Sequence, residues 1–193
     1  MKKYLVLFIL MVGSTTVFSQ SALFSTYLKM GYDSVSKQTY VPDMNFSGQR
    51  MLSEHWGVFG FCLVEQKTAK AYGGVVYSPA KWVKLRVGIG LEQKPSLYRL
   101  AAGALFNFDK FTIFLAGERG KDDVGKPGQN YWYRASAKYQ VKNWELGVIS
   151  WRYHATGLWL GYAPTKWLNI WTVPGYDFRV NAWRVVVGLD TRI

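Results

Sequence analysis

Residues 78–93, SPAKWVKLRVGIGLEQ, alternate strictly between apolar and polar side chains after a short turn-like segment. Aliphatic side chains occupy every second position from Val83 to Leu91, and Lys84, Arg86 and Glu92 lie in the other row. A period of two predicts a β-strand with two different faces. A soluble sheet would bury the aliphatic row, whereas a membrane barrel would turn it toward lipid. The period alone does not decide between the two.

The junction between turn and strand in this stretch recurs along the chain. SEHWGVFGF, SPAKWVKLRV, NFDKFTIFL, QVKNWELGV and APTKWLNIW each combine a short polar turn, an aromatic residue and a new apolar strand. The spacing of 23 to 33 residues suits a meander of hairpins, with two strands of about ten residues in each period. The aromatic residues, which we expect at a membrane interface, are Trp56, Trp82, Phe111, Trp144 and Trp167.

Between these turns the sequence predicts about twelve strands, with ten as the smaller alternative, and no helix longer than a turn. The expected ranges are 22–32, 43–52, 57–66, 70–78, 83–93, 97–106, 111–119, 131–139, 144–153, 156–163, 167–176 and 179–192. Strands of about ten residues, tight turns on one side and aromatic girdles are typical of membrane barrels. We therefore expect an all-β fold, a single antiparallel up-and-down transmembrane β-barrel over residues 20–193.

The first nineteen residues predict a cleaved signal peptide. Lys2 and Lys3 precede an apolar run, and small residues occupy the positions before a cut at Gln20. The apolar run is too short to span a membrane as a helix. Cys62 is the only cysteine, so no disulfide can form within the exported chain.

Composition narrows the classes of partner. Hydrophobic residues make up 49% of the chain and aromatic residues 17%, yet they come in alternation rather than in blocks, which excludes further helical spans. The formal net charge is +12, which favours anionic partners such as membrane lipid or acidic solutes. Nucleic acid is not expected, because the chain is exported.

Residues 20–193 resemble the bacterial outer-membrane β-barrel proteins as a class. The C-terminal VVVGLDTRI is similar to the terminal signal read by the barrel-assembly machinery, although Ile193 replaces the usual phenylalanine. The resemblance implies a location in the outer membrane of a Gram-negative envelope. It also implies contact with outer-membrane lipid, lipopolysaccharide and the barrel-assembly machinery.

The polar rows of the strands suggest the function. Long cationic side chains facing lipid near the midplane would cost about 2–4 kcal/mol each, so we expect these rows to face the interior. The expected basic residues of the lumen are Lys84, Arg86, Arg99, Arg134, Lys138 and Arg184. Their expected acidic partners are Glu92, Glu118, Glu145 and Asp190.

Three functions are compatible with this interior. An open basic lumen would form a narrow, porin-like channel that prefers small anionic solutes. If the charges neutralise one another, the barrel would be closed and would serve as a structural component of an envelope or secretion assembly. The third is a lipid A-modifying barrel enzyme, because YHATG at 153–157 faintly resembles the His-x-Ser stretch of lipid A deacylases.

The sequence does not predict a catalytic site. Thr156 stands where a deacylase would have its serine, and no acidic residue follows before Tyr176. The two histidines, His55 and His154, have no cysteine or histidine at ligand spacing. We therefore expect no enzymatic activity, no metal and no cofactor.

Overall fold

The computed structural model describes residues 21–31, 41–64, 69–93, 98–120, 131–152 and 154–192, and within these ranges it describes the side chains of residues 44–191. The expected signal peptide, residues 1–19, lies outside the described residues. In the part of the chain that is described, no helix is both long enough and apolar enough to cross a membrane.

Twelve β-strands make up the described structure. They are β1 (Ser21–Gly31), β2 (Val41–Met51), β3 (Trp56–Val64), β4 (Ala69–Ala80), β5 (Val83–Glu92), β6 (Arg99–Phe108), β7 (Phe111–Gly120), β8 (Tyr131–Val141), β9 (Trp144–Trp151), β10 (Ala155–Thr165), β11 (Leu168–Asp177) and β12 (Ala182–Arg192). Each expected strand corresponds to one of these, and the bounds agree to within three residues.

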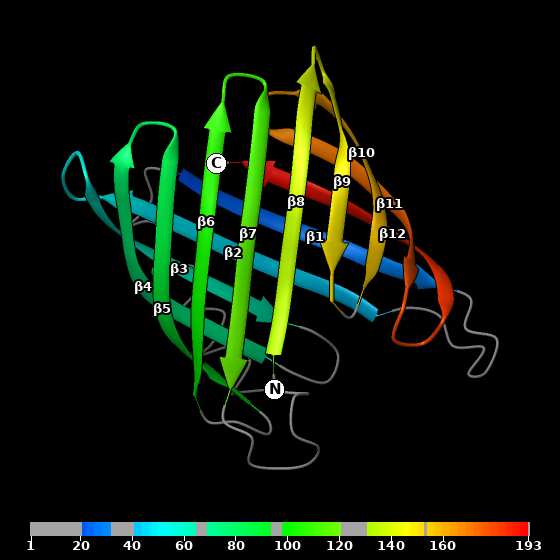
Figure 1. Cartoon of the computed structure of the whole chain (residues 1–193), viewed down its shortest axis with the longest axis horizontal. Helices are drawn as coiled ribbons and strands as arrows, with labels where there is room; N and C mark the ends of the chain where they lie inside the picture. The colour runs from blue at the N-terminus through cyan, green and yellow to red at the C-terminus, as the bar shows by residue number, and fades with distance from the viewer. Residues whose placement is uncertain are drawn as a thin grey trace.

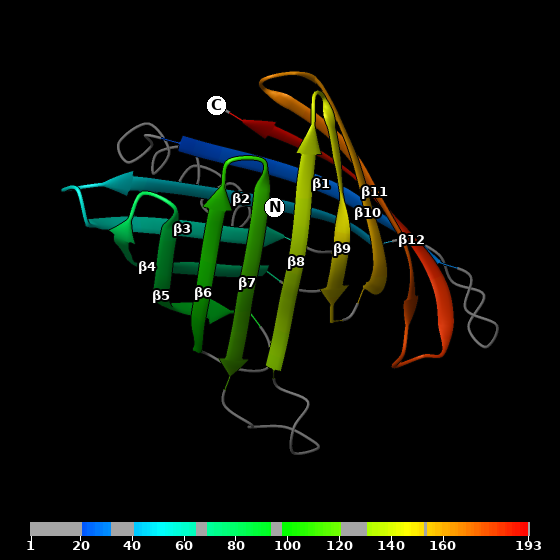
Figure 2. The same ribbon diagram turned by 45° about the horizontal axis from the view of Figure 1, so that its top comes forward.

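Every strand pairs antiparallel with the next one along the chain, and β1 also pairs with β12, so that the hydrogen-bonded order closes on itself. In Figures 1 and 2, β1–β3 form the wall behind β5–β8, and β9–β12 complete the ring. The expected all-β, antiparallel, up-and-down architecture is confirmed.

Tight turns lie together at one end of the barrel, which we call the turn end; the opposite end is called the far end. The hairpins β4–β5, β6–β7 and β8–β9 close there (Figure 1). Asp109 and Lys142, with φ of 50° and 52°, begin the two-residue connections of the last two hairpins. Positive φ is required by the tightest hairpin turns, and it commits both residues to a conformation that L-amino acids rarely adopt.

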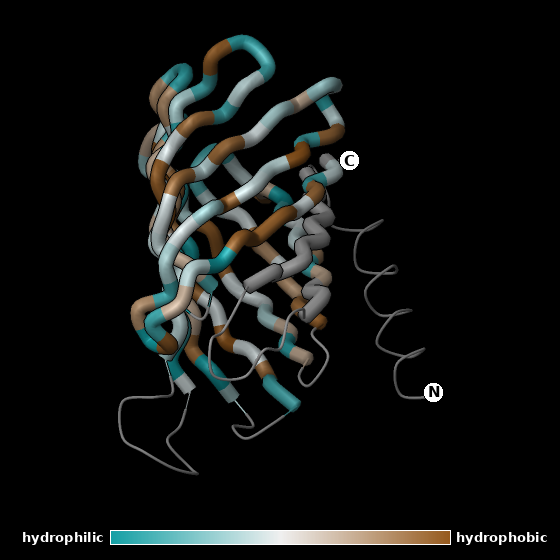
Figure 3. Tube along the Cα trace, turned by 90° about the vertical axis from the view of Figure 1, so that its right-hand side faces the viewer, coloured by the Kyte–Doolittle hydropathy of each residue, from teal (hydrophilic) through white to brown (hydrophobic). Residues whose placement is uncertain are grey.

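The outward rows of the strands are apolar and exposed. On β5, Leu85, Val87, Ile89 and Leu91 are exposed, up to 67% for Leu91, while Lys84, Arg86 and Glu92 alternate with them. Hydrophobic and hydrophilic positions alternate along the strands in the same way (Figure 3). A water-facing wall of this kind would be unstable, but a lipid-facing wall requires it.

Aromatic residues gather at the turn end. All five expected interface aromatics, Trp56, Trp82, Phe111, Trp144 and Trp167, are exposed. Three of them contact a second aromatic ring. The pairs are Trp56 with Tyr77, Trp82 with Phe108 and Trp144 with Tyr162, at 4.7–5.0 Å between centroids. Rings of this kind prefer the headgroup level of a bilayer.

Inward-facing glycines accept aromatic rings from neighbouring strands. A Cβ on Gly188 would collide with the Trp171 indole, and one on Gly90 would collide with the Tyr72 ring. Each of these pairs is directly opposed in the strand register. Glycine is needed at these positions because a ring lying flat on the wall leaves no room for a side chain.

Candidate functional site

The six expected basic residues all lie on inward rows of the barrel, but their surroundings differ. Arg99, Lys138 and Arg184 lie within 4 Å of a carboxylate, and Arg134 lies over aromatic rings. Two, Lys84 and Arg86, do not have an acidic neighbour among the described residues. The charged residues of the interior therefore form separate groups.

A far-end network joins Lys70, Tyr72, Glu92, Arg99 and Glu118, which come from β4 to β7. Arg99 Nη1 donates to Glu92 Oε2 at 2.6 Å, and Arg99 Nε lies 3.5 Å from Glu118 Oε2. Lys70 Nζ lies 3.6 Å from Glu92 and 3.5 Å from Glu118. The Tyr72 hydroxyl donates to Glu118 at 2.8 Å. Two cations face two carboxylates, so the network is electrically balanced.

Lys70 and Tyr72 are additional lumen residues that were not among those expected from the sequence. Both lie on the inward row of β4, whose burial alternates from residue 72 to residue 78. The signal was available, because Lys70, Tyr72, Gly74 and Val76 occupy alternate positions of an expected strand. The exact partners depend on the register between four strands, which the sequence does not give.

A second group lies on β8 and β9. Lys138 Nζ is 3.2 Å from Glu145 Oε2 and 4.1 Å from the centroid of the Trp159 ring. The Arg134 guanidinium lies over the Trp151 ring, 4.5 Å from its centroid, and 5.6 Å from that of Trp159. Cation–π contacts of this kind stabilise desolvated cations.

Two stacked tryptophans pack beside these cations. The Trp159 and Trp171 rings lie 4.6 Å apart and are fully buried or nearly so. The Trp159 indole donates to Glu145 at 3.2 Å, and the Trp171 indole donates to Asp190 at 2.9 Å. Asp190 therefore serves as a hydrogen-bond acceptor for an indole.

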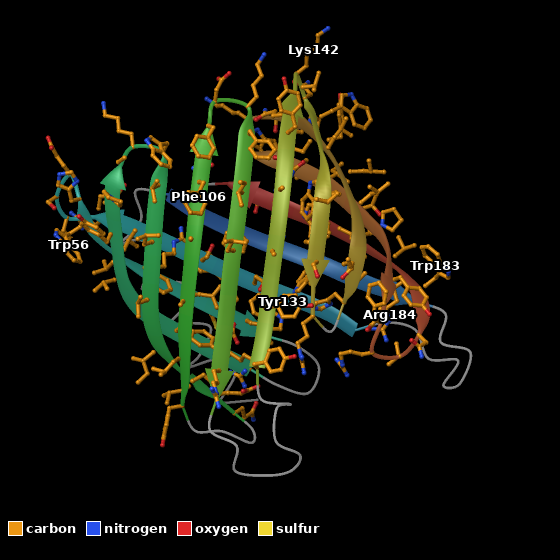
Figure 4. All side chains as sticks on the ribbon, viewed as in Figure 1. Trp56, Phe106, Tyr133, Lys142, Trp183 and Arg184 are labelled. Carbon is orange, nitrogen blue, oxygen red and sulfur yellow. The ribbon has the colours of Figure 1, made fainter. Side chains whose placement is uncertain are left out.

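Arg184, the last expected lumen cation, pairs with an acid that the sequence analysis did not single out. Its Nη1 lies 3.3 Å from Asp177 Oδ2, across the β11–β12 hairpin. Figure 4 shows Arg184 at the far end of the barrel, beside Trp183. Asp177 also accepts a hydrogen bond from the backbone of Arg179, so it caps this hairpin.

Lys84 and Arg86 are the exception. No acidic side chain of the described residues lies within ion-pair distance of either. Arg86 Nη2 donates to Gln49 Oε1 at 2.6 Å, and the guanidinium lies 5.8 Å from the centroid of the Phe59 ring. A neutral amide and a ring hold Arg86 in place without cancelling its charge.

The two sides of the interior differ in their packing. The inward residues of β9–β12 are mostly buried and form an apolar core of Ile149, Trp151, Ala155, Trp159, Trp171, Val173 and Val186. The inward residues of β6 and β7 beyond Arg99 are all partly exposed: Ala101, Gly103, Leu105, Thr112, Phe114, Ala116 and Glu118. In the ring of twelve strands, β5 and β11 are six places apart in either direction. Lys84 and Arg86 are partly exposed and lie on the strand next to β6, on the side opposite the packed core, while Gly88 and Gly90 of the same row are buried.

The residues considered for catalysis lie away from Lys84 and Arg86. His154 is buried, with its ring 3.9 Å from that of Trp151. The Thr156 and Ser150 hydroxyls lie 3.0 Å apart on the outward side. No group of three or more His, Cys, Asp or Glu residues that could hold a metal occurs in the described part of the chain.

Comparison with known proteins places the fold. No family model matches the chain, and no curated protein matches it. Among solved structures, the KdgM porin matches with a TM-score of 0.54 and 13% identity over 88% of this chain and 98% of that chain. The same porin in complex with disordered oligogalacturonate matches with a TM-score of 0.51 and 15% identity, over 89% of this chain and 98% of that chain. Outer membrane phospholipase A from Escherichia coli matches with a TM-score of 0.56 and 12% identity, over 94% of this chain and 96% of that chain.

These likenesses show the fold, at identities too low to carry a function. The chain has the fold of bacterial outer-membrane β-barrels, as its sequence predicts at the level of the class.

Proposed function

We propose that this protein is an outer-membrane channel that admits small anionic solutes along the β5–β7 wall, past Lys84 and Arg86. The observation that carries the proposal is the pair of inward cations without an acidic partner in the described residues. Arg99, Lys138 and Arg184 each lie within 4 Å of a carboxylate, and Arg134 contacts the aromatic rings of the packed side. The excess positive charge of the interior is therefore concentrated at Lys84 and Arg86.

The placement of this pair favours anions on electrostatic grounds. Two residues apart on one strand, the Cα atoms of Lys84 and Arg86 are separated by roughly 7 Å. Two unit charges at that distance repel by roughly 0.6 kcal/mol in water and roughly 2.4 kcal/mol at an effective dielectric constant of 20. A passing anion would relieve this repulsion, which lowers its barrier relative to that of a cation.

Small residues lie beside Arg86 on β6 and β7. Ala101, Gly103 and Ala116 are small residues and partly exposed, whereas the opposite wall is filled by tryptophans. Gly103 pairs directly with Arg86, and Ala116 pairs with Gly103. Small side chains beside a fixed guanidinium leave space for a hydrated solute. One structural neighbour, the KdgM porin, has been solved with an oligogalacturonate, which is an acidic solute, and this supports the same class of cargo.

Planar-bilayer recordings of the purified protein test the proposal. Channels should appear, and Arg86→Glu should reduce their preference for chloride over potassium. Lys110→Glu, which makes the same charge change at an exposed turn residue, should leave the preference unchanged. Absence of channels, or equal effects of the two substitutions, would refute the proposal.

The packed side of the interior favours a second candidate. A closed barrel would act as a structural component of an envelope or secretion assembly, and the buried core beneath β9–β12 is what such a barrel requires. The bilayer recordings separate the two, because a closed barrel gives no current.

In either case we expect the protein to contact outer-membrane lipid and lipopolysaccharide, and to be inserted by the barrel-assembly machinery. We also propose that it does not modify lipid A. Unaltered host lipid A in the mass spectrum after expression of wild type and of His154→Ala is the expected result; a change that depends on His154 would contradict it.

A further inference from the structure

Polar side chains interrupt the apolar outer surface at one place near the far end. On the outward rows of β7 to β10, and directly after β9, neighbouring positions are occupied by charged or hydroxyl-bearing residues. We call them the outer polar patch: Arg119, Tyr131, Tyr133, Ser150, Arg152 and Thr156. Figure 4 shows Tyr133 low on β8, well away from Lys142 at the turn end.

Contacts between side chains and backbone hold the patch together. The Arg152 guanidinium lies over the Tyr131 ring, 3.5 Å from its centroid. Tyr131 stacks with Tyr133 at 6.5 Å, and the Arg152 amide donates to the Tyr133 carbonyl at 3.0 Å. Because of these contacts, the cation of Arg152 is fixed on the outer surface rather than free to extend away from it.

Arg119 lies on the neighbouring strand on the other side of this tyrosine. It is directly opposed to Tyr131 in the β7–β8 register and is exposed. Arg119 on β7 and Arg152 after β9 therefore lie on the two sides of the strand that carries Tyr131. The hydroxyl groups of Ser150 and Thr156, 3.0 Å apart, and of Tyr133, 3.5 Å from Ser150, add hydrogen-bonding groups beside them.

Such a patch is costly unless it meets an anion. Cations on a lipid-facing row cost about 2–4 kcal/mol at the midplane, and the cost falls toward zero only at the headgroup level. At that level the strongest partner for a guanidinium is a phosphate, which accepts charge-assisted and often bidentate hydrogen bonds.

We propose that the outer polar patch binds the phosphate monoester of a membrane lipid, with Arg119 and Arg152 on either side of the phosphate. A monoester can carry up to two negative charges, so it matches two cations. A zwitterionic headgroup would bring an ammonium group toward the same two cations. In the usual orientation of outer-membrane barrels, with tight turns in the periplasm, the far end lies in the outer leaflet. There the fitting lipid is a phosphorylated glycolipid, for which lipid A is the probe. The site is independent of whether the interior conducts.

Native mass spectrometry of the full-length, detergent-solubilised protein tests the site. We expect wild type to retain lipid A and phosphatidic acid, and not to retain dephosphorylated lipid A or phosphatidylethanolamine. Arg119→Ala/Arg152→Ala should lower the occupancy by lipid A about tenfold or more, as the loss of charge-assisted hydrogen bonds predicts. Lys81→Ala/Lys110→Ala removes the same charge from turn-end residues and should leave occupancy unchanged.

Two results would overturn the proposal. One is equal retention of lipid A by the Arg119/Arg152 variant and wild type; the other is equal retention of phosphorylated and dephosphorylated lipid A by wild type. The second comparison needs no variant, so it decides even where the variant does not fold. Arg119→Lys/Arg152→Lys keeps the charge. Its occupancy by lipid A should lie between that of wild type and that of the double alanine variant. Because bilayer currents are measured separately, a failed site and a failed channel give different results.

Discussion

Arg99 and Glu92, on neighbouring strands at the far end, are joined by a hydrogen bond of 2.6 Å in which both side chains are almost completely buried. Six residues before Glu92 on the same inward row, Arg86 has no such partner in the described structure. The inward row of β5 therefore carries a cation without an acidic partner at Arg86 and, six residues further on, belongs to a network in which the charges balance. This difference determines which part of the barrel interior carries excess positive charge.

Removal of Arg99 should destabilise the barrel. Arg99→Met removes the cation closest to Glu92 and leaves Lys70 within 3.6 Å of both Glu92 and Glu118. Breaking a buried ion pair typically costs about 3–5 kcal/mol. We expect a decrease in the free energy of unfolding of about 3 kcal/mol, measured by urea titration in lipid vesicles with tryptophan fluorescence.

The double variant Arg99→Met/Glu92→Gln is the control for this loss. It removes one charge of each sign and leaves Lys70 opposite Glu118, so it should recover most of the stability. A single variant as stable as wild type would contradict the assigned network.

Gly188 should be intolerant of even one methyl group. A Cβ there would collide with the Trp171 indole, whose position is fixed by its hydrogen bond to Asp190. We expect Gly188→Ala to lower the free energy of unfolding by about 1–3 kcal/mol, the usual cost of overpacking. Gly60→Ala is the matched control, because nothing lies within 4 Å of its Cβ position. Similar effects of the two substitutions would argue against this packing.

The buried pair of Lys138 and Glu145 should not influence ion selectivity. The pair lies beside Trp159 on the packed side of the interior. Replacement of both, as Lys138→Met/Glu145→Gln, keeps the volume and the net charge. We expect the chloride-to-potassium permeability ratio to stay at the wild-type value in bilayer recordings. A changed ratio would place the conducting path on the tryptophan side.

A larger side chain on the side opposite the packed core should obstruct passage. Ala116 lies on the inward row of β7, in the register that also contains Gly103 and Arg86. Ala116→Leu is expected to reduce the single-channel conductance while folding normally. Ala104→Leu, on an outward row of β6, serves as the comparison and should conduct like wild type. Equal conductance of the two variants would exclude this route.

Much of the fold follows from the sequence because a barrel repeats one simple rule. Alternating side chains specify which residues face inward, and the aromatic turns specify where strands begin. The positions of Lys84, Arg86, Arg99 and Lys138 on inward rows could be derived in this way. Trp56, Trp82 and Trp144 at the turn end could be derived as well.

Strand register and β-bulges could not be predicted from the sequence. The pairing between β4 and β5 shifts between Tyr77 and Ala80, and the Ser78 hydroxyl donates to the Val83 carbonyl at 2.8 Å. Val83, expected to face lipid with the other aliphatic residues, is only 6% exposed at this irregularity. A local bulge changes what a residue contacts without altering the alternation that the sequence displays.

The difference between the two walls could not be predicted either. The sequence places Trp159 and Trp171 on inward rows but does not show that they stack and fill one side. The sequence shows which cationic and acidic residues face inward but not which of them form ion pairs. Ion-pair partners depend on the register between neighbouring strands. The assignment of Arg99 to a network and of Arg86 to the side opposite the packed core required three-dimensional contacts.

The reversal potential of single channels in a salt gradient shows whether Lys84 and Arg86 make the channel selective for anions. With potassium chloride of different concentration on the two sides, the wild-type current should reverse at a potential of the sign given by anion selectivity. Lys84→Glu/Arg86→Glu should move that potential to zero or to the opposite sign, and Lys81→Glu/Lys110→Glu should move it less. A wild-type protein that gives no current, or a reversal potential that the Lys84/Arg86 exchange leaves unchanged, would contradict the account.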